Sequence, residues 1–80
     1  MTPDDISARI SAALPDAQVA VSDTTGGGDH FSATVVSTAF EGKGPVDRHR
    51  IVYAALGDLM RGPIHALALV TSTPAEHQRK

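Results

Sequence analysis

The side chains with the widest chemical range in this chain of 80 residues are its four histidines, at positions 30, 49, 65 and 77. An imidazole can bind a metal, transfer a proton near neutral pH, or satisfy a hydrogen bond. The chain has no cysteine, which excludes disulfide bonds and any thiolate metal site made by this chain alone. No spacing pairs a histidine with a serine or aspartate as in nucleophilic catalysis, so we do not expect an enzyme.

A second candidate group is basic and consists of Lys43, Arg48 and Arg50. Side chains of this kind contact phosphate groups or acidic partner proteins. Glu41 and Asp47 interleave with them, aromatic residues make up only 4% of the chain, and the net charge is −2. The composition therefore gives no general attraction to nucleic acids or anionic membranes. We expect these basic residues to be structural or partner-facing, with weak DNA binding as the alternative.

Length and composition indicate a single domain over 1–80, with a folded core at about 3–73 and a polar tail at 74–80. A hydrophobic content of 41% with 20% charged residues is typical of a globular fold. No apolar run approaches the roughly 20 residues of a membrane span, and the N-terminus lacks a signal pattern. We expect a cytoplasmic protein without membrane contact, either a monomer or a weak homodimer when alone.

The first half of the chain predicts one helix followed by two strands. The segment 2–5 (Thr-Pro-Asp-Asp) is typical of a helix start, and apolar residues follow at helical spacing until Pro15 ends the helix. Alternating apolar residues predict strands at 17–22 and 31–36. The segment 23–29 between them contains three consecutive glycines and is predicted to be a flexible hairpin loop, with only a weak indication of anion binding.

The second half predicts a long helix and a third strand. The helix is expected over 45–61, and Gly62-Pro63 ends it. The segment 64–71 is apolar and partly β-branched, which predicts the third and most buried strand. A last helical turn is expected at 73–76. The order α-β-β-α-β indicates an α+β fold with a small mixed sheet.

The predicted topology brings two histidines together. The helix between strands two and three is a crossover long enough for these strands to pair in parallel. His30 opens strand two and His65 opens strand three, so direct pairing places both at one edge of the sheet, beside the glycine loop. His49 is spaced with apolar helix residues and is expected to pack at the edge of the core.

Several motifs together resemble the BolA family over about residues 17–76. They occur in the family's order and at its spacing. These motifs are Asp29-His30-Phe31, Val35-Val36-Ser37, Phe40–Lys43, Asp47–Tyr53, Leu56–Leu59 and Gly62–Leu69.

The resemblance implies a KH-like fold of the second type, with helices on one face of a three-stranded mixed sheet. It also implies a partnership with a monothiol glutaredoxin in iron–sulfur assembly, trafficking, or iron and redox regulation. The partners share a [2Fe–2S] cluster held by the glutaredoxin cysteine, by glutathione, and by one or two ligands from the BolA-like protein. The family's histidine at the start of the last strand is His65 here. His77 stands where the family usually has tryptophan, which implies a looser C-terminus.

The second ligand stays open at this point. The family usually takes it from the loop between the first two strands, where this chain offers only His30, at the end of the loop. Both a two-histidine and a one-histidine site fit the sequence, and in the second case His30 pairs with Asp29 or the backbone. Because protons compete with iron for imidazole, we expect cluster binding to weaken below roughly pH 6.

The alternative function is that of a DNA-binding transcriptional regulator that uses the basic start of the long helix, at Lys43, Arg48 and Arg50. The two arginines fall on different helix faces, however. Gly42-Lys43-Gly44 is also not the GxxG loop with which KH domains clamp a nucleic-acid backbone.

Overall fold

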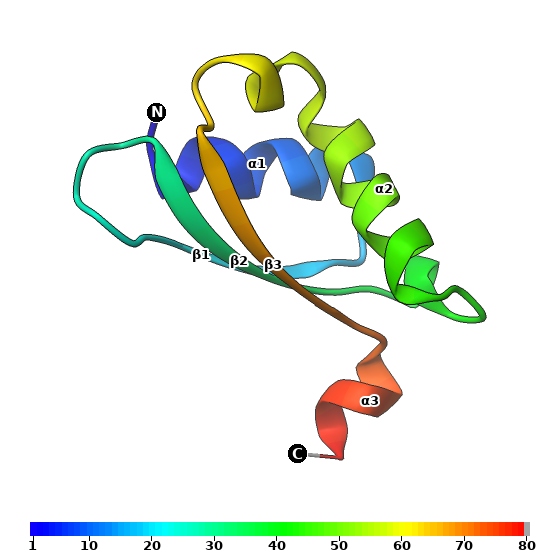
Figure 1. Ribbon diagram of the computed structural model, residues 1–80. Helices are drawn as coiled ribbons and strands as arrows, with labels where there is room; N and C mark the ends of the chain where they lie inside the picture. Colours follow the sequence, from blue (N-terminus) through cyan, green and yellow to red (C-terminus); the bar gives the residue numbers. More distant parts are fainter. Residues whose placement is uncertain (80) are drawn as a thin grey trace.

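A three-stranded sheet is covered on one face by two helices, and a short helix follows the last strand (Figure 1). The computed structural model describes residues 1–79. Its order confirms the predicted α-β-β-α-β arrangement and the α+β class. The elements are α1 (Pro3–Ala13), β1 (Gln18–Asp23), β2 (His30–Val36), the 3₁₀ helix η1 (Thr38–Phe40), α2 (Pro45–Leu56), the 3₁₀ helix η2 (Gly57–Arg61), β3 (Ala66–Ser72) and α3 (Pro74–Gln78).

Helix α1 begins at a reciprocal cap, as the segment 2–5 predicts. The Thr2 hydroxyl accepts a hydrogen bond from the Asp5 N–H at 3.2 Å, and the Asp5 carboxylate accepts one from the Thr2 N–H at 2.9 Å. These two bonds satisfy backbone donors that a helix start otherwise leaves unpaired. Over the next two turns, Ile6 and Ile10 are completely buried. By fixing the residue at which the helix begins, the cap is consistent with an orientation in which the apolar face of α1 packs against the sheet.

The sheet has the order β1-β2-β3, with β1 and β2 antiparallel and β2 and β3 parallel. The prediction that the third strand is the most buried was wrong. Strand β3 lies at an edge and alternates between exposed and half-buried residues, whereas the central strand β2 buries four of its seven residues. An apolar run alone does not distinguish a central strand from an edge strand of small residues, such as Ala66 and Ala68.

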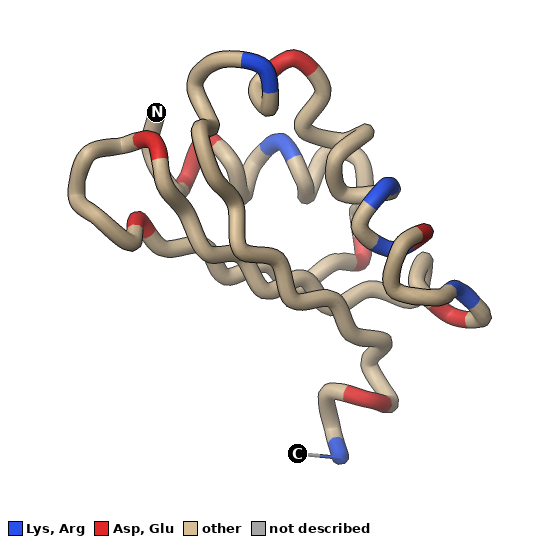
Figure 2. Tube along the Cα trace, in the orientation of Figure 1, with Lys and Arg blue, Asp and Glu red and all other residues tan. Residues whose placement is uncertain are grey.

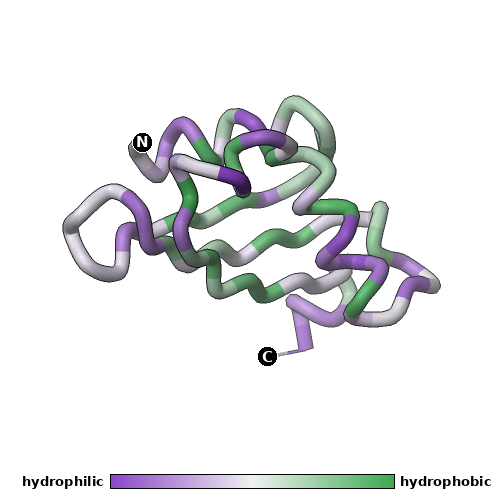
Figure 3. The backbone as a smooth tube through the Cα atoms, turned by 45° about the horizontal axis from the view of Figure 1, so that its top comes forward, coloured by the Kyte–Doolittle hydropathy of each residue, from purple (hydrophilic) through white to green (hydrophobic). Residues whose placement is uncertain are grey.

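The hydrophobic core lies between the inner face of the sheet and the two long helices. Hydrophobic stretches of the strands and helices surround this layer, while the β1–β2 loop and the C-terminal end are more hydrophilic (Figure 3). Within the described part of the chain, no helix combines the length and apolar character needed to cross a membrane. The residues of the main core cluster are Ile6, Ile10, Leu14, Phe31, Val35, Phe40, Val52, Leu56 and Ile64.

The long helix is shorter than predicted, since α2 ends at Leu56 rather than at residue 61. Gly57 has a φ of 55°, a backbone region that only glycine enters readily, and its N–H donates to the Tyr53 carbonyl. The chain then continues as the tighter helix η2 up to Arg61. Gly57 is thus the helix stop, and Gly62-Pro63 ends only the 3₁₀ extension.

Helix α3 is the helical turn expected at 73–76, and it is attached to α2 by an ion pair. The Thr73 hydroxyl accepts from the Glu76 N–H, and the Glu76 carboxylate accepts from the Thr73 N–H. The same carboxylate receives two hydrogen bonds from the Arg48 guanidinium, at 2.7 and 3.1 Å. Part of the predicted tail at 74–80 is therefore helical, and its last residue lies outside the described residues. Whether the C-terminus is looser than in relatives with tryptophan stays a prediction.

This ion pair predicts a loss of α3 docking in acid. The Arg48 guanidinium, followed by the Thr73 N–H, lowers the pKa of Glu76 from 4.5 to about 2. Because the folded-state pKa is the lower one, the carboxylate stabilises the folded state fully above about pH 4.5, and this contribution disappears as the pH falls toward 2. We expect the α3 amide resonances to move toward unfolded positions in this window in an NMR titration. The Glu76→Gln variant should show no such step, and an equal step in that variant would contradict this explanation.

Candidate metal-ligand site

The parallel pairing of β2 with β3 places two imidazoles next to each other. His30 is the first residue of β2 and pairs with Ala66, the first residue of β3. His65 immediately precedes Ala66 in the sequence and therefore lies beside His30. The two ring centroids are 5.0 Å apart and the ring planes are tilted by 49°. This arrangement confirms the predicted convergence of His30 and His65 at one edge. We call His30, His65 and the adjacent Asp29 the histidine rim.

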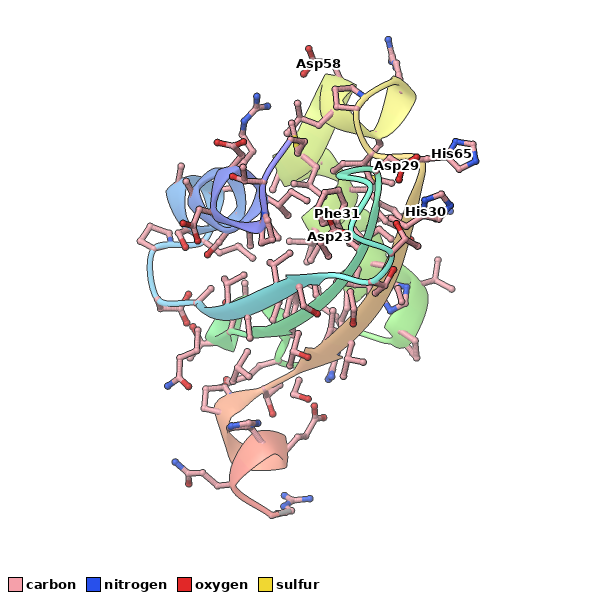
Figure 4. The ribbon with its side chains drawn as sticks, turned by 90° about the vertical axis from the view of Figure 1, so that its left-hand side faces the viewer. Asp23, Asp29, His30, Phe31, Asp58 and His65 are labelled. Carbon is pink, nitrogen blue, oxygen red and sulfur yellow. The ribbon has the colours of Figure 1, made fainter. Side chains whose placement is uncertain are left out.

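The histidine rim faces outward, away from the core (Figure 4). His65 is an exposed residue, and 38% of the His30 side chain is accessible. Phe31, the next residue along β2, is buried, with only 2% of its surface exposed. Neighbouring residues of a strand point to opposite faces, so Phe31 faces the core while His30 faces outward. The chain thus anchors β2 through Phe31 and leaves the imidazoles free for a second molecule to contact.

Asp29 connects the two histidines. One of its carboxylate oxygens, Oδ1, lies 2.9 Å from the Nδ1 atom of His30. Its backbone carbonyl accepts the N–H groups of His65 at 2.8 Å and of Ala66 at 3.2 Å. The hydrogen bond with His30 is the main cause that lowers the pKa of Asp29. The sequence offered this pairing only as the alternative to ligation by His30, yet the contact occupies Nδ1 alone and leaves Nε2 available.

The glycine loop is organised by Asp23, which no sequence motif distinguishes from the other aspartates. Its carboxylate accepts the N–H groups of Thr25, Gly26 and Gly28 at 3.1, 2.8 and 2.9 Å. The expectation of a hairpin loop is confirmed, but the loop has an internal hydrogen-bonded core that a count of glycines does not reveal. The same carboxylate already uses the amides that an external anion would need, so the geometry gives no support to anion binding.

The imidazole nitrogens of the histidine rim can supply some, but not all, of the ligands that a metal ion needs. Among residues 1–79, no group of three histidine, aspartate or glutamate side chains is arranged to hold a metal ion. Two neighbouring imidazoles are nevertheless suitable nitrogen ligands for iron, including iron in a cluster. A metal centre at this rim therefore needs further ligands from a partner.

The three basic candidates have different surroundings. Only 14% of the Arg48 side chain is accessible, and it bonds Glu76 and, through Nε, the Lys43 carbonyl at 2.8 Å. Lys43 and Arg50 are exposed, and acidic positions lie beside them around the start of α2 (Figure 2). Arg48 thus has a structural role, while Lys43 and Arg50 stay candidates for partner contact.

The remaining two histidines belong to the helices α2 and α3. His49 is half-buried on α2, as expected, and its ring packs edge-on against Tyr53 with 6.3 Å between the centroids. His77 is exposed on α3.

Known proteins resemble this chain in sequence and in fold. The family model for BolA-like protein matches residues 9–76. BolA-like protein 1 of Homo sapiens is 53% identical over 47 residues, which are 59% of this chain and 34% of the relative. The DNA-binding transcriptional regulator BolA of Vibrio cholerae is 48% identical over 54 residues, which are 68% of this chain and 51% of the relative. This chain thus spans only about a third of the mammalian relatives that it matches.

A solved structure extends the likeness over the whole fold. A BolA protein homologue from Coxiella burnetii superposes with a TM-score of 0.86 at 41% identity, and the match covers 99% of both chains. The fold expected from the resemblance, a three-stranded mixed sheet with helices on one face, is therefore confirmed. With the family match over residues 9–76, this superposition shows that the chain belongs to the BolA family.

Proposed function

We propose that this protein binds a monothiol glutaredoxin and supplies imidazole ligands, His65 and His30, to a [2Fe–2S] cluster that it shares with the glutaredoxin and glutathione. The role would lie in iron–sulfur assembly, trafficking, or iron and redox regulation. The observation that carries the proposal is the pair of accessible imidazoles, 5.0 Å apart, on a rim facing solvent. Family membership and the absence of cysteine support it further. Without a thiolate, the imidazole nitrogens are the ligands that this chain can offer to such a cluster.

The residues of the rim have separate tasks in this proposal. His65, at the start of β3, is the principal ligand, and His30 adds a second nitrogen through Nε2 because Asp29 occupies Nδ1. The cluster would supply one-electron redox chemistry, at a potential that rises when imidazole replaces thiolate. Phe31 and the parallel β2–β3 junction keep the two rings at a fixed separation.

Visible-region circular dichroism tests the proposal. A monothiol glutaredoxin carrying a glutathione-ligated [2Fe–2S] cluster is titrated with the wild-type protein, with the double variant His30→Ala and His65→Ala, and with His77→Ala as the matched control. We expect the wild type and the control to change the spectrum identically and the double variant to leave it unchanged. A wild-type protein without effect on the spectrum, or an active double variant, would contradict the proposal.

A second candidate function is DNA binding, which the name of the Vibrio cholerae relative states for that protein. In this chain Lys43 and Arg50 are exposed and could neutralise about two phosphate groups. We then expect the logarithm of the binding constant for duplex DNA to fall with that of the salt concentration with a slope of about −2. Fluorescence anisotropy measures the slope, and the double variant Lys43→Glu and Arg50→Glu should abolish binding. Undiminished binding by that variant would exclude this surface.

A further inference from the structure

The single residue Asp29 contacts both histidines of the rim, one through its side chain and the other through its backbone. The carboxylate lies against Nδ1 of His30, and the backbone carbonyl accepts the N–H of His65. We propose that Asp29 is a positioning residue that presets the His30 ring to offer Nε2 outward and holds the start of β3 beside it. This inference rests on the proposed function, because it assigns the ligating nitrogen of that same site.

The hydrogen bond selects one tautomer of His30. A carboxylate can only accept hydrogen bonds, so the contact of 2.9 Å between Oδ1 and Nδ1 requires the hydrogen on Nδ1. In a neutral ring the free electron pair then lies on Nε2, at the opposite side of the imidazole. Carboxylate contacts of this kind fix the orientation of metal-binding histidines and raise the basicity of the ligating nitrogen.

The neighbouring ring depends on the same contact. Among the described residues, no side chain makes a hydrogen bond to the His65 ring, and its aromatic neighbour is the His30 ring, which is tilted by 49° to it. The Asp29 carbonyl fixes the backbone of His65 and Ala66 against β2. Asp23 in turn holds the loop that carries Asp29. The carboxylate of Asp29 therefore orders the first ring directly and the second ring through it.

The tautomer can be measured in the isolated protein, without a cluster or a partner. Long-range ¹H–¹⁵N correlation spectra of the imidazoles at mildly alkaline pH assign the protonated nitrogen. We expect hydrogen on Nδ1 of His30 in the wild type, and a mixture that includes hydrogen on Nε2 in Asp29→Ala and Asp29→Asn. The control Asp58→Ala removes an equal charge from an aspartate whose side chain is 84% exposed and should leave the tautomer unchanged. Hydrogen on Nε2 of His30 in the wild type would overturn the proposal.

Binding to the cluster-loaded glutaredoxin supplies the second measurement. Asp29→Ala should hold the cluster about 10- to 100-fold more weakly than the wild type, the effect expected for residues that orient metal ligands. Equal binding by Asp29→Ala and the wild type would overturn the positioning role and leave the proposed function standing. Failure of the wild type itself to bind would overturn the proposed function, whatever the tautomer of His30.

Discussion

Replacing His65 with alanine is expected to abolish the change that the proposed function predicts for the wild-type protein in the visible spectrum of the glutaredoxin-bound cluster. Under the proposed function the substitution removes a ligand atom, so retention of the shared cluster should fall by more than the roughly 100-fold expected when only a supporting residue is lost. His65 is exposed, and its structural hydrogen bond comes from the backbone N–H, which alanine keeps. The variant should therefore fold normally, as far-UV circular dichroism and thermal unfolding can verify.

The variant His30→Ala determines how many ligands this chain supplies. Loss of the spectral change in both single variants indicates a two-histidine site, whereas loss in His65→Ala alone indicates a one-histidine site. His49→Ala is a useful control because His49 lies on helix α2 and is not part of the histidine rim. An unaltered spectrum with His65→Ala would remove His65 from the coordination shell and with it the central assignment of the proposed function.

The substitution Phe40→Ala should have the largest effect on stability among the variants considered. Phe40 belongs to η1, has no exposed surface and is part of the main core cluster. Truncation of a buried phenylalanine costs about 3–5 kcal/mol, through lost burial and the cavity left behind. A domain of this size has a total free energy of unfolding of about 4–12 kcal/mol. We expect a large decrease in the urea midpoint, with part of the population unfolded at 25 °C if the wild-type stability lies at the lower end.

Tyr53→Ala is the matched control for this experiment. Tyr53 is 39% exposed on α2, so the loss of its ring should cost no more than about 1 kcal/mol. Because Phe40 follows the far end of β2, the folded fraction of Phe40→Ala should retain the same imidazole tautomers as the wild type. Equal urea midpoints for the two variants would show that burial of Phe40 does not stabilise the core as described.

Much of the fold could be predicted because hydrophobic periodicity and chain breaks follow directly from residue types. The spacing of apolar residues predicted the two long helices and the three strands, and the length of the crossover predicted the parallel pairing that unites His30 and His65. The 3₁₀ helices η1 and η2 were not predicted. Element ends were less predictable. Gly57, rather than Gly62-Pro63, ends α2, because the stop depends on which glycine takes a positive φ. The edge position of β3 depends on packing between elements, which a linear pattern does not contain.

Most of the supporting hydrogen bonds of the site could not be predicted from the sequence, for a different reason. The pairing of Asp29 with His30 was among the alternatives that the sequence offered, but the role of Asp23 was not, because it arises only when the loop brings three backbone amides within about 3 Å of its carboxylate. Asp16 behaves likewise, since its carboxylate accepts hydrogen bonds from the hydroxyls of Ser37 and Thr38 and from the Thr38 N–H. The contacts of Asp16 join segments more than 20 residues apart, and local sequence patterns cannot anticipate contacts of that kind.

The parallel β2–β3 junction also governs when the histidine rim can form during folding. The β1–β2 hairpin closes through contacts between neighbours in sequence, whereas β3 joins only after the chain has closed the long connection through α2, which is the slower and entropically costlier event. A chain with the hairpin alone presents His30 without its companion ring. Under the proposed two-histidine site, a partner that engages both imidazoles would therefore bind folded molecules, whose last strand has docked, and not incompletely folded ones.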